Sequence, residues 1–78
     1  MAVANTTKDL GRLVKMLRDQ LGLSQERFAA KLGVTFSSVN RWENGHRKPS
    51  PLAMKQIESI LLELGPAGKN LHDEFFNQ

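Results

Sequence analysis

Residues 24–44, SQERFAAKLGVTFSSVNRWEN, limit the possible folds of this chain more than any other segment. Ser24 is a typical N-cap residue, because its hydroxyl can accept a hydrogen bond from the free N–H groups of a helix that begins at Gln25. Gly33 has no side chain, so it can adopt the left-handed conformation that ends a helix and redirects the chain. A short helix with a tight glycine turn is therefore predicted. One face of this helix carries Phe28, Ala29 and Leu32 at three- and four-residue spacing.

A second short helix is predicted directly after this turn. Thr35 is suited to cap its N-terminus, and Asn44-Gly45 is suited to end it. Val39 and Trp42 lie on its inner face, where Trp42 is expected to be a core residue. Ala29 on the first helix has a small side chain, which lets the second helix cross closely. The segment therefore predicts two short helices that cross at a defined angle.

Two longer helices are predicted on either side of this pair. The first covers about Thr7–Leu21 and ends at Gly22. The other begins at Pro51, because proline disfavours a helical conformation at Ser50 yet fits the first helical position, and it ends at Gly65-Pro66. Their apolar sides are expected to consist of Leu10, Leu13, Val14, Leu17 and Leu21 in the first helix and of Leu52, Ala53, Ile57, Ile60, Leu61 and Leu64 in the other.

The C-terminal tail, residues 66–78, is expected to contribute only a short element. A Pro-Ala-Gly loop comes first, and Asn70 is expected to cap a last turn or two of helix. The apolar residues of this region exceed what a small core obviously needs, so they either pair two subunits, bind a protein partner or are buried in the monomer. These residues are Leu62, Leu71, Phe75 and Phe76.

Length and composition limit the class of protein. With 78 residues, the chain allows one small domain. The strongly apolar stretch 60–62 is far too short to span a bilayer, and the N-terminus lacks a basic region followed by an apolar one. The chain has no cysteine, which excludes a disulfide framework and is consistent with a reducing compartment. We expect one soluble, intracellular domain over residues 1–78, with its core at about residues 8–65.

Candidate catalytic or metal-ligating groups are few. His46 lies in a basic stretch and His72 in an acidic tail, and no paired carboxylate or cysteine suggests a site that the two share. The chain also lacks a glycine-rich motif that would cradle phosphates. We therefore expect a protein that is not an enzyme and that uses neither a metal nor a cofactor.

Charge is distributed unevenly along the chain, whose net charge is +3. Ten of the eleven Lys and Arg residues precede Glu58, but only four of the eight acidic residues do. A positive region of this kind attracts phosphate backbones, although Lys and Arg also populate ordinary protein surfaces. The basic part of the chain is the part that contains the two short helices.

A family resemblance rests on a set of residues at fixed spacing, Gln25, Ala29, Gly33, Val39 and Trp42, followed by Glu43-Asn44-Gly45. They resemble the helix-turn-helix of phage repressor and Cro-like (Xre-family) DNA-binding proteins, over about residues 8–65. The resemblance implies an all-α, compact, four- to five-helix lambda-repressor-like domain, in which helices two and three form the helix-turn-helix. It also implies a cytoplasmic protein, bacterial or phage-encoded, that joins the nucleoid when it binds double-stranded DNA.

The outward face of helix three is expected to meet base edges in the major groove. Arg41 can donate two hydrogen bonds to guanine, Asn40 can pair with adenine, and Ser37 can donate or accept. Phe36 either lies against a thymine methyl group or folds back onto the core. The alternative for Arg41 and Asn40 is a phosphate contact or a solvated helix face.

Residues beside this helix are expected to contact phosphates, which would fix the register of the base contacts. By resemblance, Gln25 reaches the DNA backbone from the N-terminal end of helix two, where the helix carries partial positive charge. Also by resemblance, Arg18 and Glu43 form a structural ion pair between helix one and the end of helix three. The alternative for the loop after helix three is simple exposure to solvent. The other phosphate contacts are expected from Ser38, Asn44, His46, Arg47 and Lys48.

These expectations favour a sequence-specific transcriptional regulator, most simply a repressor that occludes a promoter. One short recognition helix reads only a few base pairs, so a homodimer on two half-sites is expected. Two alternatives stay open. An antitoxin would bind its own operon with this domain and hold a toxin through the tail, whereas an interaction adaptor would use the exposed helix to bind a protein instead of DNA.

Overall fold

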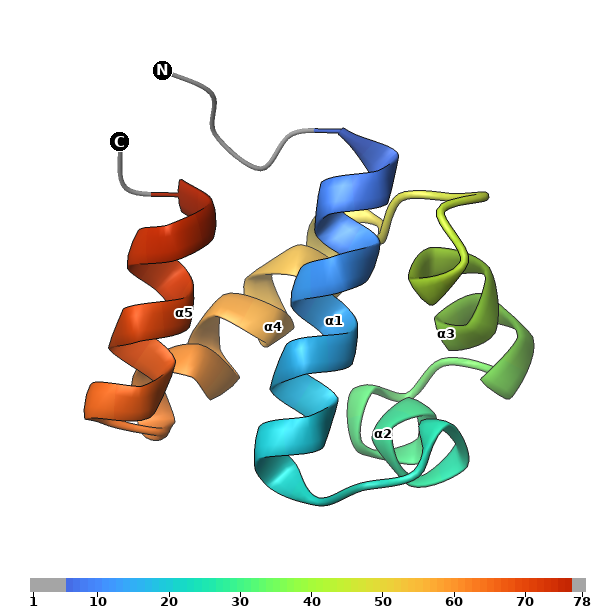
Figure 1. Cartoon of the computed structure of the whole chain (residues 1–78). Coiled ribbons are helices and arrows are strands. Elements are labelled where there is room, and N and C mark those ends of the chain that lie inside the picture. The colour runs from blue at the N-terminus through green and yellow to red at the C-terminus, as the bar shows by residue number, and fades with distance from the viewer. Residues whose placement is uncertain (1–5, 77–78) are drawn as a thin grey trace.

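The computed structural model describes residues 6–76, except for the side chain of Phe76, and this part of the chain is all-helical. It forms α1 (Thr7–Leu21), α2 (Gln25–Leu32), α3 (Phe36–Glu43), α4 (Pro51–Glu63) and α5 (Pro66–Phe76). Figure 1 shows α1 in the middle of the molecule, with α5 on one side and α2 and α3 on the other. The all-α fold expected from the sequence is confirmed.

Side-chain caps and a left-handed glycine set the boundaries of the two short helices. The Ser24 hydroxyl accepts a hydrogen bond from the backbone N–H of Arg27 at 3.1 Å. The Thr35 hydroxyl accepts one from the backbone N–H of Ser38, also at 3.1 Å. Gly33 ends α2 with a φ of 73°. Because caps satisfy N–H groups that a first helical turn leaves free, each helix begins at a defined residue, as predicted.

One apolar core joins all five helices. Trp42 of α3 is buried in it, as expected, and Leu71 and Phe75 bring α5 into the same cluster. Ala29 is buried where α2 packs on its neighbours, in agreement with the need for a small side chain. The largest fully buried side chains are Leu13, Val14, Leu17, Phe28, Val39, Ile57 and Leu61.

Two glycines inside helices mark places where backbones touch. A Cβ atom on Gly11 of α1 would overlap the carbonyl oxygen of Trp42 and would lie 3.3 Å from that of Glu43. A Cβ atom on Gly68 of α5 would overlap the carbonyl oxygen of Leu61 in α4. The first contact brings the end of α3 onto α1, and the second brings α5 onto α4.

The C-terminal tail differs from the sequence prediction. The expected Pro-Ala-Gly loop is wrong, because α5 begins at Pro66, and Asn70 lies inside this helix rather than at its cap. Proline fits the first helical position, and the close contact of Gly68 with α4 explains a glycine within the helix. Leu71 and Phe75 are buried in the monomer, which is one of the three alternatives left open for them. The side chain of Phe76 lies outside the described part of the structure.

Leu52 is a second correction, because this predicted core residue is 70% exposed. It lies in the first turn of α4, seven and eleven residues before Ser59 and Glu63, so it shares their helical face. Both of these residues are exposed. The buried side of α4 consists instead of Ala53, Ile57, Ile60 and Leu61.

Candidate nucleic-acid interface

The outward face of α3 carries the four side chains that were expected to meet bases. Ser37 and Arg41 are exposed and Asn40 is half-buried. Phe36 is 48% exposed, so its ring does not fold back fully onto the core. The opposite face of α3 is buried, which leaves these side chains on one accessible surface of a short, capped helix.

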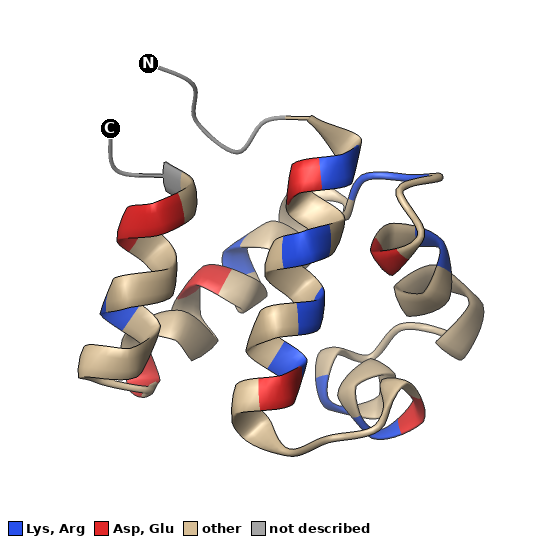
Figure 2. Cartoon of the chain, viewed as in Figure 1, with Lys and Arg blue, Asp and Glu red and all other residues tan. Residues whose placement is uncertain are grey.

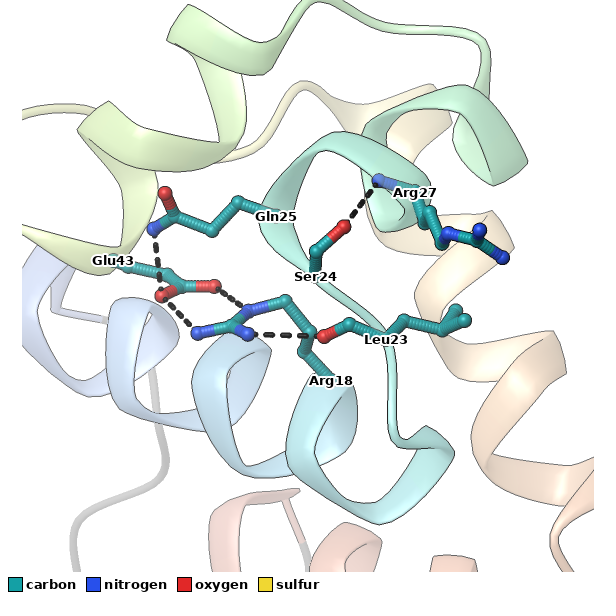
Figure 3. Close-up of polar contacts among 6 residues, drawn as sticks. All are labelled: Arg18, Leu23, Ser24, Gln25, Arg27 and Glu43. Carbon is teal, nitrogen blue, oxygen red and sulfur yellow. Dashed lines mark hydrogen bonds and ion pairs between the residues drawn. The ribbon is translucent and has the colours of Figure 1, made fainter.

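A hydrogen-bonded ion pair holds the C-terminal end of α3 against α1 (Figure 3). Arg18 donates from Nε to Oε2 of Glu43 at 2.7 Å and from Nη2 to Oε1 at 3.0 Å. Its Nη1 donates to the carbonyl oxygen of Leu23 at 3.0 Å. Two parallel bonds between a guanidinium and a carboxylate fix orientation as well as distance. This network therefore fixes the position of α3 relative to α1 and to the turn that precedes α2.

The ion pair is largely withdrawn from water, since the side chains of Arg18 and Glu43 are 16% and 5% exposed. Hydrogen bonding to the Glu43 carboxylate raises the pKa of Arg18 above its ordinary value, although burial acts in the opposite direction. Arginine is already protonated at neutral pH, so the guanidinium of Arg18 stays charged. The negative charge of Glu43 therefore has a permanent partner.

Gln25, the expected phosphate contact on α2, points toward Glu43 in Figure 3. Its Nε2 donates a hydrogen bond to Glu43 Oε1 at 3.0 Å. An amide nitrogen carries two hydrogens, so this bond uses one of them. The same bond ties the first residue of α2 to the last residue of α3, and it thereby orients the Gln25 amide.

The loop after α3 turns back toward the helix that it leaves. Gly45 adopts a left-handed conformation with a φ of 76°, and the backbone N–H of His46 donates to the carbonyl oxygen of Arg41 at 2.9 Å. Pro49 is buried, which anchors the far end of the loop. The exposed side chains of this loop are those of Asn44, His46, Arg47 and Lys48.

A cavity of about 220 Å³ lies between α3 and this loop. Four of the expected DNA-contact residues line it together, whereas Asn44 and His46 are not among its lining residues. Cations and hydroxyls in one recess can bind an anion such as a phosphate. The charged and hydroxyl side chains of the lining are Ser38, Arg41, Arg47, Lys48 and Ser50.

Ser50 is the lining residue that sequence reasoning treated only as a helix cap. It does cap α4, because its hydroxyl accepts a hydrogen bond from the backbone N–H of Ala53 at 3.2 Å. The sequence signal that could have placed Ser50 in the cavity was its position two residues after Lys48, because the buried Pro49 between them keeps this segment against the fold.

Lys and Arg residues are concentrated in the part of the chain that contains the short helices. Figure 2 shows Lys and Arg along α1, in α2 and α3 and in the loop after α3. From Glu58 onward the sequence has one Lys and four acidic residues, so the end of α4 and α5 form the more acidic side. A phosphate backbone is therefore attracted toward the first four helices and the loop after α3 rather than toward α5.

Neither a metal-binding group nor a membrane-spanning helix is found within residues 6–76. No group of three or more His, Cys, Asp or Glu side chains is arranged to hold a metal ion in this part of the chain. None of the described helices is long and apolar enough to cross a membrane.

Two short capped helices, joined by a left-handed glycine, with the second held against α1 by an ion pair, define a helix-turn-helix domain. A helix-turn-helix family model matches residues 14–61 of the 78-residue chain. The protein belongs to the Xre/Cro-like helix-turn-helix family.

Curated relatives agree with this assignment. Proteins named "Uncharacterized HTH-type transcriptional regulator" from Sinorhizobium medicae and Rhizobium meliloti are each 31% identical to the chain over 52 residues. The matching segment is 67% of this chain but 37% of each relative, so the chain spans well under half of their length. No solved structure gives a significant match to the chain.

Proposed function

We propose that this protein is a sequence-specific regulator of transcription that binds double-stranded DNA and reads the major groove with α3. The observation that carries the proposal is the accessible polar face of α3 directly beside the basic cavity. An α-helix fits the major groove, and neighbouring cations neutralise phosphates on its edge. The base contacts would come from Phe36, Ser37, Asn40 and Arg41, and the phosphate contacts from Gln25, Ser38, Asn44, His46, Arg47 and Lys48.

The direction of regulation that we propose is repression. A small domain bound across a promoter excludes polymerase without needing a further surface, whereas activation needs a contact with the polymerase. A reporter gene behind the bound site should therefore lose expression when the protein is supplied. An increase in expression would contradict repression without affecting the proposal of DNA binding.

Selection from fragmented genomic DNA of the source organism tests the proposed binding. The purified protein is incubated with the fragments at near-physiological salt, and the recovered fragments are sequenced. We expect enrichment of a motif with two-fold symmetry, because two copies of α3 would read two half-sites. Recovery of DNA without a motif would contradict sequence specificity. Recovery of no DNA would favour the use of this fold as a protein-interaction adaptor.

Two arginine substitutions should separate base contact from phosphate contact. Arg41→Ala should weaken binding to the selected site by roughly 5- to 150-fold and relax the preference at one position, because a base contact is lost. Arg47→Ala should weaken binding to all sequences. It should also lower the slope of log affinity against log salt concentration by about one, as expected for one lost phosphate contact. Titrations at several salt concentrations, on specific and scrambled DNA, measure both effects.

Lys31→Ala is the matched control, since it removes one positive charge from an exposed residue of α2 that lines neither the cavity beside α3 nor the groove between α4 and α5. It should leave both the affinity and the base preference nearly unchanged. If Lys31→Ala weakens binding as much as Arg47→Ala does, the effect of Arg47 is one of net charge and not of a local contact.

A homodimer through the corner between α4 and α5 is part of the proposal. Leu62 is 73% exposed there, beside a groove of about 480 Å³ that Gly65 and Pro66 also line. A second copy related by a two-fold axis would cover the same leucine on both subunits. In Figure 1 this corner lies away from α3, so pairing there leaves both recognition helices accessible.

Leu62→Glu should abolish this dimer and lower operator affinity at least about tenfold, because the two half-sites are then bound independently. Sedimentation measures the oligomeric state, and a DNA titration measures the affinity. Leu52→Glu is the control for sedimentation, since Leu52 is equally exposed at the other end of α4. A Leu62→Glu protein that remains dimeric would exclude this corner as the interface.

A further inference from the structure

Phe36 is an apolar side chain on an otherwise polar surface. Within the described part of the chain, three large hydrophobic residues are exposed, namely Phe36, Leu52 and Leu62. Of these, Phe36 alone belongs to α3. Its neighbours on the outward face are Ser37 and Arg41, both exposed. A phenylalanine that is 48% exposed contributes less to folding than a buried one would. Its position therefore suggests a partner outside the domain.

The place of Phe36 in the helix is well defined. Phe36 is the first residue of α3, directly after the cap Thr35, whose hydroxyl accepts from the Ser38 N–H at 3.1 Å and also lies 2.9 Å from the Ser38 hydroxyl. In helix-turn-helix proteins, the N-terminal residues of the second helix contact base edges. The cap thus holds Phe36 at the end of α3 that enters the groove.

The chemistry of the major groove leaves one partner for a phenyl ring. Base edges there present hydrogen-bond donors, acceptors and a single apolar group, the C5 methyl of thymine. A donor or acceptor buried against the ring would lose its water without gaining a hydrogen bond, which is unfavourable. Contact with the methyl group costs no hydrogen bond, and it removes apolar surface from water. A cytosine methylated at C5 presents the same methyl group at the same ring position.

We propose, on the basis of the DNA binding proposed above, that Phe36 is a specificity residue that reads the C5 methyl group of a pyrimidine. Binding is then sensitive to that methyl group and not only to hydrogen-bonding edges. Uracil, which keeps the hydrogen-bonding edge of thymine but lacks the methyl group, should bind more weakly at this position. Methylated cytosine should be preferred over cytosine there.

The test replaces each thymine of the selected site by deoxyuridine, one at a time, and measures the dissociation constant at fixed salt. For the unchanged protein, one thymine in each half-site should give a loss of about fourfold, as expected for one buried methyl group. At the same position, 5-methylcytosine should bind more tightly than cytosine by a similar factor. Phe36→Ala should remove both differences, whereas Phe36→Leu should keep part of them.

Leu52→Ala serves as the control, because it shortens another exposed apolar side chain and should keep the full response to uracil. Circular dichroism and thermal unfolding show that each variant is folded. Tight binding of the site with no effect of uracil at any position would overturn this inference alone. A response to uracil that persists in Phe36→Ala would also overturn it. Failure to bind any DNA would overturn both this inference and the proposed function.

Discussion

Replacing Gly11 by alanine is expected to destabilise the domain by about 2 kcal/mol and to lower its melting temperature by roughly 10 °C. Intrinsic helix propensity alone predicts the opposite sign, since alanine is favoured over glycine inside a helix by up to about 1 kcal/mol. The tertiary contact reverses this preference. The new Cβ atom would overlap the carbonyl oxygen of Trp42, a backbone atom that has no rotamer by which to move away.

Relief of this overlap requires α3 to move away from α1. Trp42 is buried in the core and Glu43 is held by Arg18, so both of these interactions would be strained by the movement. Chemical unfolding with a linear extrapolation measures the loss. Gln20→Ala, at an exposed position of the same helix, is the control and should change the stability by less than about 0.5 kcal/mol. A Gly11→Ala protein as stable as the original would show that α1 and α3 do not pack this closely.

Removal of the Glu43 carboxylate is expected to cost about 2–3 kcal/mol of unfolding free energy. Glu43→Ala takes away the acceptor of two Arg18 hydrogen bonds and of one from Gln25. Loss of one partner of a fully buried ion pair costs more, but the 16% exposure of the Arg18 side chain lets water reach part of the stranded charge. Glu63→Ala, which removes an exposed acid at the end of α4, should have little effect.

A double-mutant cycle separates the value of the pair from the cost of stranding one charge. Arg18→Met combined with Glu43→Leu should be clearly more stable than the sum of the single changes predicts, by at least about 1 kcal/mol. The reason is that two apolar side chains leave no charge behind. Additive single effects would mean that the carboxylate and the guanidinium do not stabilise each other. Arg18→Lys should also lower the stability, because lysine cannot donate two parallel hydrogen bonds to the carboxylate.

The two short helices were predictable because their signals are local. The caps Ser24 and Thr35 each bond within three residues along the chain, and Gly33 ends α2 through its own backbone conformation. A family resemblance supplied the partnership of Arg18 with Glu43, which are 25 residues apart. Periodicity alone misplaced Leu52. In the sequence, a leucine just beside the apolar stripe of α4 cannot be distinguished from a leucine within it.

Part of the candidate site followed from the sequence in the same way. The residues on the outward face of α3 follow from helical spacing, once Val39 and Trp42 are taken as its buried side. The cavity does not follow from helical spacing, since its lining joins Ser38 and Arg41 on a helix to residues of the following loop. The orientation of Gln25 toward Glu43 is likewise a contact between two helices.

The sequence by itself determined where the first four helices begin, the glycine turn between the short pair and the uneven distribution of charge. The tertiary structure decided the extent of α5, the reason for glycine at positions 11 and 68 and the grouping of cations around one cavity. The physical reason is the range of the interactions. Caps, turns and helical periodicity act over a few residues, whereas the distance between two backbones depends on how distant segments pack.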